Sequence, residues 1–141
     1  MKPIIGKQFP LVVIPLIEKV KRNLDIVVFD WRWYPQDPGS PVQLFNQAIV
    51  RAVRRGVQVR AVANNNQIIS TLRSVGVNAC RQRATNLLHC KIMILDRESV
   101  ILGSHNYTQN AFSVNTELSV HIYPGEDVKS YLDFFNSLFK I

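Results

Sequence analysis

Six residues between positions 89 and 106 suit chemistry on an anion. They are His89, Lys91, Asp96, Gly103, Ser104 and Asn106. A neutral imidazole can act as a nucleophile, and an ammonium group two residues away can hold a phosphate oxygen and favour charge building on it. The combination predicts nucleophilic attack on phosphorus.

The apolar residues around these six predict a hairpin that positions them. We expect one strand over 90–95 and another over 100–102, with a turn between them. His89 and Lys91 lie two apart at the start of the first strand, so they should point to the same face. The loop after the second strand, 103–106, can present backbone N–H groups, a hydroxyl and an amide to the same phosphate.

Each of these residues taken alone has a more ordinary interpretation. A single histidine before an apolar strand is usually structural, and a lysine at a strand end is usually solvated. Asp96 would normally be a turn residue, a role that we also expect it to have here. The joint spacing outweighs these interpretations, because six defined residue types at fixed positions occur by chance about once in 10⁸ positions.

Residues 89–106 read H-C-K-I-M-I-L-D-R-E-S-V-I-L-G-S-H-N. This resembles the HxKxxxxDxxxxxxGSxN signature of the phospholipase D superfamily at every defined position. The likeness extends more loosely over residues 15–140, including 54–60 (RRGVQVR) and the Tyr107-Thr108 continuation of the motif loop. It implies a phosphodiesterase in which His89 forms a covalent phosphohistidine.

The chain holds one copy of this motif. Enzymes of the superfamily need two, because one histidine attacks phosphorus and another protonates the leaving oxygen. Neither His105 nor His121 begins a second H-x-K. The chain is therefore similar to the short single-motif members, the bacterial metal-independent endonucleases and their mitochondrial relatives. In those proteins two chains share one site about a two-fold axis, so the resemblance implies a homodimer.

Glu117 is a further candidate, eleven residues after Asn106. It lies in a segment expected to be a strand, 117–123, where a carboxylate among apolar neighbours needs a partner. In nucleases of this superfamily a glutamate here orients the catalytic histidine, so the resemblance assigns that role to Glu117. It would fix the imidazole tautomer and stabilise the charged ring.

The order of the predicted elements indicates the fold class. We expect helices over 15–23, 45–55 and 67–75 (capped by Asn66) and from about Glu126 onward, and further strands over 26–29, 57–62 and 77–80. Strands that alternate with helices and then form a hairpin predict an α/β fold, a mixed β-sheet flanked by helices on both faces. We expect one phospholipase D-like domain over 1–141, with 1–14 assigned to no element.

The charge of the chain favours a polyanionic partner. Its 141 residues include 17 Lys and Arg against 10 Asp and Glu, a net charge of +7, which suits nucleic acid or an anionic membrane. Arg81, Arg83 and the backbone of Gly103 are candidate contacts with a phosphate backbone. The helix arginines Arg51, Arg54 and Arg55 fit an ordinary solvated face equally well.

The sequence predicts neither a metal site nor a cofactor. Cys80 and Cys90 are its two cysteines, no Cys/His spacing fits zinc, and no carboxylate cluster fits Mg²⁺. We interpret both thiols as small buried groups in a reducing compartment, which indicates the cytoplasm. The apolar run 9–17 continues into charged residues and fits a first helix better than a leader. No stretch approaches the ~20 apolar residues of a membrane span, and a secreted or periplasmic location would require a leader already removed.

These features favour an endonuclease that hydrolyses DNA or RNA without a metal. A phospholipase or phosphatidyl transferase would use the same motif, although the small size and positive charge favour nucleic acid. A non-catalytic nucleic-acid-binding module is a third hypothesis, and the intact motif counts against it. Trp31, Trp33 and Tyr34 could stack on bases, while core packing or a subunit interface is the better explanation for at least one of them.

Overall fold

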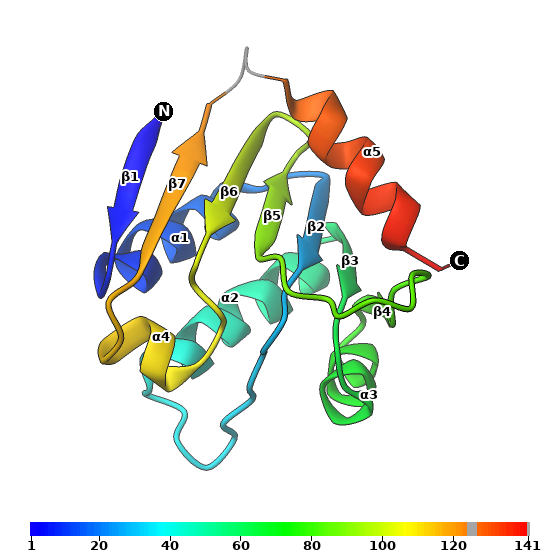
Figure 1. The fold of residues 1–141 in the computed structure, drawn as a ribbon. Helices are drawn as coiled ribbons and strands as arrows, with labels where there is room; N and C mark the ends of the chain where they lie inside the picture. The colour runs from blue at the N-terminus through cyan, green and yellow to red at the C-terminus, as the bar shows by residue number, and fades with distance from the viewer. Residues whose placement is uncertain (124–126, 141) are drawn as a thin grey trace.

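Strands from both ends of the chain pair into one mixed sheet in the computed structural model, which describes residues 1–123 and 127–140 (Figure 1). The strands are β1 (Lys2–Ile5), β2 (Asn23–Val27), β3 (Gln58–Val62), β4 (Asn78–Cys80), β5 (Ile92–Leu95), β6 (Ser99–Gly103) and β7 (Leu118–Ile122). The helices are α1 (Gln8–Lys19), α2 (Pro41–Arg54), α3 (Asn66–Ser74), α4 (Gln109–Ser113) and α5 (Val128–Leu138).

The strand order brings several loops to one edge of the sheet. The order is β1-β7-β6-β5-β2-β3-β4, with β2, β3 and β4 parallel and every other pair antiparallel. The carboxyl ends of β2, β3, β4 and β6 therefore meet the amino ends of β5 and β7 at the lower edge in Figure 1. We call this the site edge. Its loops are 28–40, 63–65, 81–91, 104–108 and 115–117.

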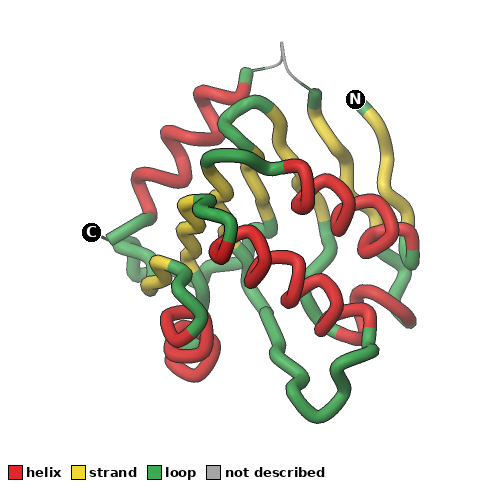
Figure 2. The backbone as a smooth tube through the Cα atoms, turned by 180° about the vertical axis from the view of Figure 1, so that it is seen from behind, coloured by secondary structure: helices red, strands yellow, loops and turns green. Residues whose placement is uncertain are grey.

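Helices cover both faces of the sheet, which confirms the predicted fold class. Phe9 of α1, Phe45 of α2 and Phe112 of α4 belong to one buried cluster, with the side chains of α3. Phe135 of α5 belongs to a second cluster on the opposite face. Figure 2, seen from behind, shows α1 and α2 on the face away from α5.

The N-terminal segment forms structure that the sequence did not indicate. Residues 2–5 are the edge strand β1, antiparallel to β7. This strand has four residues, contains Pro3 and buries one side chain fully, that of Ile4. So short a segment carries no measurable alternation, and it forms a strand because β7 offers it a partner.

Several helix ends differ from the predicted ones. α1 begins at Gln8, within the segment 1–14 that was assigned to no element, and contains Pro15; α2 begins at Pro41 and not at 45. α1 ends at Lys19 and not near Asn23, because the N–H groups of residues 21–23 bind the Asp96 carboxylate instead of continuing the helix. Asn65, not Asn66, caps α3 by accepting a hydrogen bond from the N–H of Ile68. The predicted start of the last helix at Glu126 lies outside the described residues. Within residues 1–123 and 127–140, no helix is long and apolar enough to cross a bilayer.

Candidate active site

His89 and Lys91 lie at the site edge, just before β5. Lys91 Nζ lies 3.2 Å from His89 Nδ1 and donates to the His89 carbonyl oxygen at 2.7 Å. The Phe29 ring, which follows β2, lies 4.9 Å from the imidazole between centroids and 5.6 Å from the Lys91 ammonium. The two polar side chains meet as expected, although both residues precede the strand.

The contact with Lys91 determines which nitrogen of His89 carries the proton. An ammonium group has donors only, so Nδ1 must accept and the neutral ring carries its hydrogen on Nε2. In this arrangement Nε2 can donate a proton but cannot attack. Lys91 must therefore leave Nδ1 before Nε2 becomes a nucleophile.

Gly103 ends β6 at a place where the sheet allows no side chain. A Cβ atom there would overlap Leu118 and Ser119 of β7, so glycine permits the close approach of the two strands. The Gly103 N–H points to the Lys91 carbonyl oxygen at 3.4 Å. This group was expected to contact phosphate, and in the structure it ties β6 to the residue that precedes β5.

Ser104 and Glu117 bind each other at the start of β7. The Ser104 hydroxyl donates to Glu117 Oε1 and accepts from the Leu118 N–H at 3.0 Å. Glu117 Oε2 accepts from the Asn115 amide at 3.1 Å. The Ser104 hydroxyl was expected to donate to phosphate, and in the structure it donates to the Glu117 carboxylate instead.

The expected contact of Glu117 with His89 is not among the hydrogen bonds of the described residues. The carboxylate is half-buried, and it precedes the strand that was predicted to contain it. Its two oxygens serve Ser104 and Asn115 instead.

Asn106 is oriented by the backbone of a neighbouring loop. Its Oδ1 accepts from the Asp30 N–H at 3.0 Å, which identifies the amide oxygen, since a backbone N–H only donates. The Asn106 Nδ2 group makes no hydrogen bond within the described part of the chain. It remains free to donate to an anion at the site edge.

Asp96 lies at the opposite end of β5 from His89. Its carboxylate accepts from the N–H groups of Lys21, Arg22 and Asn23 at 2.7–3.0 Å. Partial burial alone would raise the pKa of Asp96, but these three hydrogen bonds together lower it. Asp96 also occupies the hairpin turn with φ of 51°, a conformation that Asp tolerates. The structure separates Asp96 from the other motif residues and gives it a positioning task.

The two arginines before the motif already have partners in the fold. The Arg81 guanidinium donates to Asn66 Oδ1 and to the Asn64 carbonyl, both at 3.0 Å. Arg83 donates to the Phe139 carbonyl at 3.0 Å, which ties this loop to the end of α5. Both side chains are exposed, and a guanidinium has five N–H donors, so further hydrogens can reach an anion.

The helix arginines Arg51 and Arg55 act mainly within the fold. Arg51 pairs with Glu18 at 2.7 Å, and Arg55 donates to carbonyl oxygens at the end of α1, those of Ile17 and Val20. Arg54 is exposed.

His105 is a buried residue whose place the sequence did not reveal. It is 1% exposed, stacks on Phe9 at 4.4 Å, and contacts the Ser119 hydroxyl at 2.7 Å and the Gly6 carbonyl at 2.9 Å. Burial lowers its pKa, although the Gly6 carbonyl and the Glu117 charge oppose this. A neutral His105 holds β1, α1 and the motif loop together.

Few other groups near His89 could compete for its chemistry. Cys90 is half-buried, not fully buried as expected, and burial raises the pKa of its thiol. In residues 1–123 and 127–140, no three His, Cys, Asp or Glu side chains gather closely enough to hold a metal ion. The site edge thus offers an exposed imidazole, an ammonium and an amide donor.

Comparison with known proteins identifies the family of the chain. The family model described as "Cardiolipin synthase, PLD-like domain" matches residues 13–139. The chain belongs to the phospholipase D superfamily. The match covers nearly all the elements that form the site edge.

Relatives within the superfamily are distant and longer. A phospholipase D of Rickettsia felis is 30% identical over 105 residues, which are 70% of this chain and 52% of the relative. Human mitochondrial cardiolipin hydrolase is 29% identical over 126 residues, 85% of this chain and 46% of that protein. The chain thus spans about half the length of the curated relatives it matches.

A solved structure shows the same fold over the full chain. Nuc of Salmonella typhimurium, a phospholipase D family member, superposes with a TM-score of 0.78 at 20% identity. The match covers 99% of this chain and 97% of that one.

Replacing Asp96 should reduce stability and leave the chemistry intact. Asp96→Ala removes a charged acceptor of three backbone N–H groups and should lower the free energy of unfolding by about 2 kcal/mol. Because the folded-state pKa is lowered, this contribution is present above the unfolded value of 3.8 and is lost as the pH falls below it. Urea unfolding at pH 7 and pH 3 measures both effects.

The matched control is Asp96→Asn, which keeps one acceptor oxygen and tolerates the positive φ. It should lose less stability and retain the phosphodiesterase activity of the folded protein. A folded Asp96→Asn protein with activity reduced 100-fold would place Asp96 in the reaction.

His105 should remain neutral at a pH at which an exposed histidine is half protonated. Its lowered pKa means that its contribution to stability is present above pH 6.5 and is lost as the pH falls through the folded-state value. NMR titration of the imidazole signals should therefore give a midpoint below 6.5. His105→Gln should flatten the decline in stability between pH 7 and pH 5, and a midpoint at or above 6.5 would contradict the neutral assignment.

Proposed function

We propose that this superfamily phosphodiesterase cuts DNA or RNA through a covalent phosphohistidine at His89, in a site shared by two copies of the chain. The observation that carries the proposal is the exposed His89 imidazole in contact with the Lys91 ammonium at the site edge. The oriented amide of Asn106 adds a donor from the neighbouring loop. A nucleophile beside an ammonium group and an amide donor suits attack on a phosphodiester.

The first step begins with the movement of Lys91. An arriving phosphate attracts the ammonium from Nδ1, which can then take up a hydrogen while Nε2 loses one. Nε2 attacks phosphorus, the N–P bond forms, and the bond from phosphorus to the leaving oxygen breaks. The leaving oxygen takes a proton from the His89 imidazolium of the second copy.

The second step reverses the proton transfer. The second copy's imidazole, now neutral, accepts a proton from water, and the hydroxide attacks phosphorus and breaks the N–P bond. Lys91 and the Asn106 amide stabilise the added negative charge in both steps. Loss of a comparable oxyanion donor reduces turnover by about 10²- to 10³-fold.

The charge distribution supports a nucleic-acid substrate. The net charge is +7, and Arg81 and Arg83, both exposed, lie on the connection that leads to His89. Positive charge beside a catalytic edge raises the local concentration of a polyanion.

A lipid phosphodiester is the second candidate substrate. The printed names of the relatives, phospholipase D and mitochondrial cardiolipin hydrolase, favour it. An apolar hollow of about 430 Å³ also lies beside Gly103, lined by Pro3, Leu102, Leu118 and Val120. Such a hollow could hold part of an acyl chain if nothing else covers it.

We assign that hollow to the second copy of the chain. α5 packs on β2, β5 and β6, and its apolar cluster extends to Ile122 at the far end of β7. The ends of β1 and β7 at the site edge, Ile5 and Leu118, lie outside that cluster. Ile5 and Leu118, paired across these strands, are 56% and 58% exposed. An apolar strip of this kind commonly marks an interface, and this one adjoins Gly103 and the motif loop. A two-fold contact there would bring two motifs together.

Cleavage should continue in excess EDTA, because the residues proposed to act need no metal. Purified protein is incubated with labelled single-stranded DNA, duplex DNA, RNA and cardiolipin vesicles, with and without chelator. We expect nucleic acid to be cut in both conditions and His89→Ala to be inactive. Loss of cutting with EDTA that Mg²⁺ restores would refute the mechanism, and hydrolysis of cardiolipin alone would favour the second candidate.

Leu118→Arg should convert the dimer to an inactive monomer. The matched control is Leu44→Arg, a 48% exposed leucine on α2, which should stay dimeric and active. Analytical ultracentrifugation gives the mass and the same cleavage assay gives the activity.

Mixed dimers test whether the two histidines act together. After subunit exchange of wild type with His89→Ala, activity should fall as the square of the wild-type fraction. A linear fall, or full activity in monomeric Leu118→Arg, would show that one chain is sufficient.

A further inference from the structure

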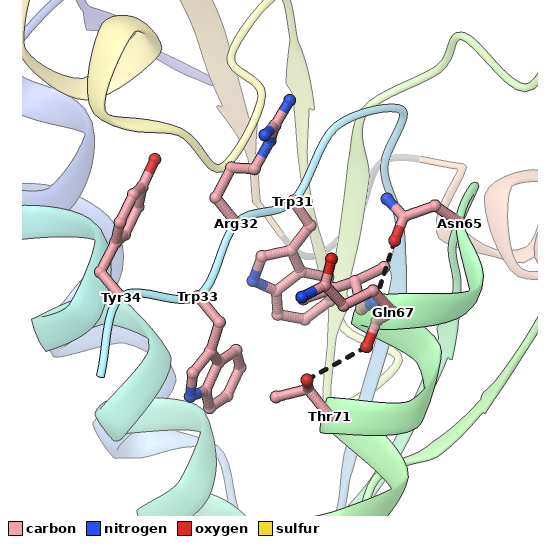
Figure 3. A pocket seen from close by; sticks show the side chains of 8 residues that line it. Trp31, Arg32, Trp33, Tyr34, Asn65, Gln67 and Thr71 are labelled. Carbon is pink, nitrogen blue, oxygen red and sulfur yellow. Dashed lines mark hydrogen bonds between the residues drawn. The ribbon is translucent and has the colours of Figure 1, made fainter. Parts of the chain in front are cut away.

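A second hollow lies at the site edge, away from the apolar strip. Its volume is about 480 Å³, and it lies between loop 31–34 and the first turns of α3. Asn65, Gln67 and Thr71 provide polar groups on the α3 side. Figure 3 shows the Trp33 indole across from Thr71, with the Gln67 side chain reaching toward the loop.

Two buried polar residues of α2 form hydrogen bonds with the loop that carries Trp33. Asn46 is 0% exposed and Gln43 is 2% exposed. Asn46 accepts from Trp31 Nε1 at 2.8 Å and donates to the Arg32 carbonyl at 3.0 Å. Gln43 accepts from the Tyr34 N–H at 2.7 Å. Burial of an amide side chain costs free energy unless the amide is hydrogen-bonded. Asn46 and Gln43 form such bonds with the backbone of Arg32 and Tyr34, the two neighbours of Trp33.

Trp33 is therefore a half-buried aromatic residue on an anchored loop. Trp31 beneath it is 1% exposed and belongs to the core, with the ring centroids 6.5 Å apart. Of the aromatic residues that the sequence suggested for stacking, Trp31 is accordingly excluded. An aromatic ring that is already held in place loses little conformational entropy when a ligand binds.

Hydrogen bonds join this loop to the catalytic motif. The Asp30 N–H donates to the Asn106 amide, the Tyr107 N–H donates to the Asp30 carbonyl, and the Arg32 N–H donates to the Tyr107 carbonyl, each at 3.0 Å.

The hollow is connected to His89 through Phe29. Phe29 contacts the imidazole, and Trp33 lies four residues further. Four residues span at most about 14 Å, which a strand of a few nucleotides can cover.

We propose that this hollow binds an unstacked base of a single-stranded nucleic acid whose phosphate lies at His89. The proposal rests on the nuclease function proposed above and specifies its substrate as single-stranded. Trp33 supplies a π-face, and the Asn65 Nδ2 group and the Gln67 amide can bond to base edges. A base inside a duplex cannot enter such a hollow without leaving its partner.

Two arginines beside the hollow suit the phosphates of the same strand. Arg32 is held by Asp30 at 2.7 Å and has 62% of its side chain exposed. Arg81 is bonded to the backbone and side chain of the 64–66 loop. The polar lining of the hollow fits a base better than an acyl chain.

The test uses binding, in a background that cannot cut. His89→Ala protein and the double variant His89→Ala/Trp33→Leu are titrated with three labelled oligonucleotides: an intact single strand, a duplex, and an abasic strand of equal length. Loss of one stacked base should weaken binding of the intact strand about 5- to 100-fold. Binding of the abasic strand, which retains the phosphates, should not change.

A matched control tests whether loss of any exposed aromatic residue weakens binding, and a second variant tests the hollow without changing Trp33. Tyr123→Leu removes a 39% exposed aromatic residue at the opposite edge and should bind every strand like the parent. If Trp33→Leu does not fold, Gln67→Ala at an exposed helix position should still weaken the intact strand more than the abasic one.

Equal binding of the intact strand by parent and variant would overturn the base site and leave the nuclease proposal standing. A parent that binds cardiolipin vesicles and none of the three oligonucleotides would overturn both.

Discussion

Three hydrogen bonds around Asp30 join the two loops on which the site depends. The loops after β2 and β6 are separated by β5, so their strands lie about 10 Å apart. They meet beyond the end of β5, where Asp30 bonds to Asn106 and Tyr107. The chain enters β5 beside this bridge, which places the His89 imidazole against Phe29. Orientation of the Asn106 amide and anchoring of the aromatic loop follow from the same contacts.

The motif residues divide into those that can meet a substrate and those that hold the site in place. His89, Lys91 and Asn106 keep groups free at the site edge, whereas Asp96 and the Ser104–Glu117 pair are occupied within the fold. An anion is recognised by donors whose hydrogens are not already used. The spacing of the motif therefore does not distinguish residues that react from residues that hold the site in place, because both kinds must lie at fixed positions along the chain.

Local patterns predicted the elements but not their distant partners. The hairpin and α2 followed from apolar periodicity, because each buries one regular face. β1 and the burial of His105 did not, since Gly6 and His105 are 99 residues apart and meet only after β1 has paired with β7. The family resemblance assigned His89 as the partner of Glu117, whereas the structure pairs Glu117 with Ser104, which lies beside the start of β7.

The two other histidines of the chain do not suit the role of the acid that the proposed reaction requires. A leaving oxygen needs a proton donor, and the other two imidazoles are 1% and 7% exposed, His105 and His121 respectively. Burial lowers the pKa of both, so neither holds a proton ready at neutral pH. We infer that the acid comes from outside this chain's fold. The proposed second copy would supply it without any new residue, since His89 is exposed and the apolar strip beside Gly103 would give that copy a surface on which to pack.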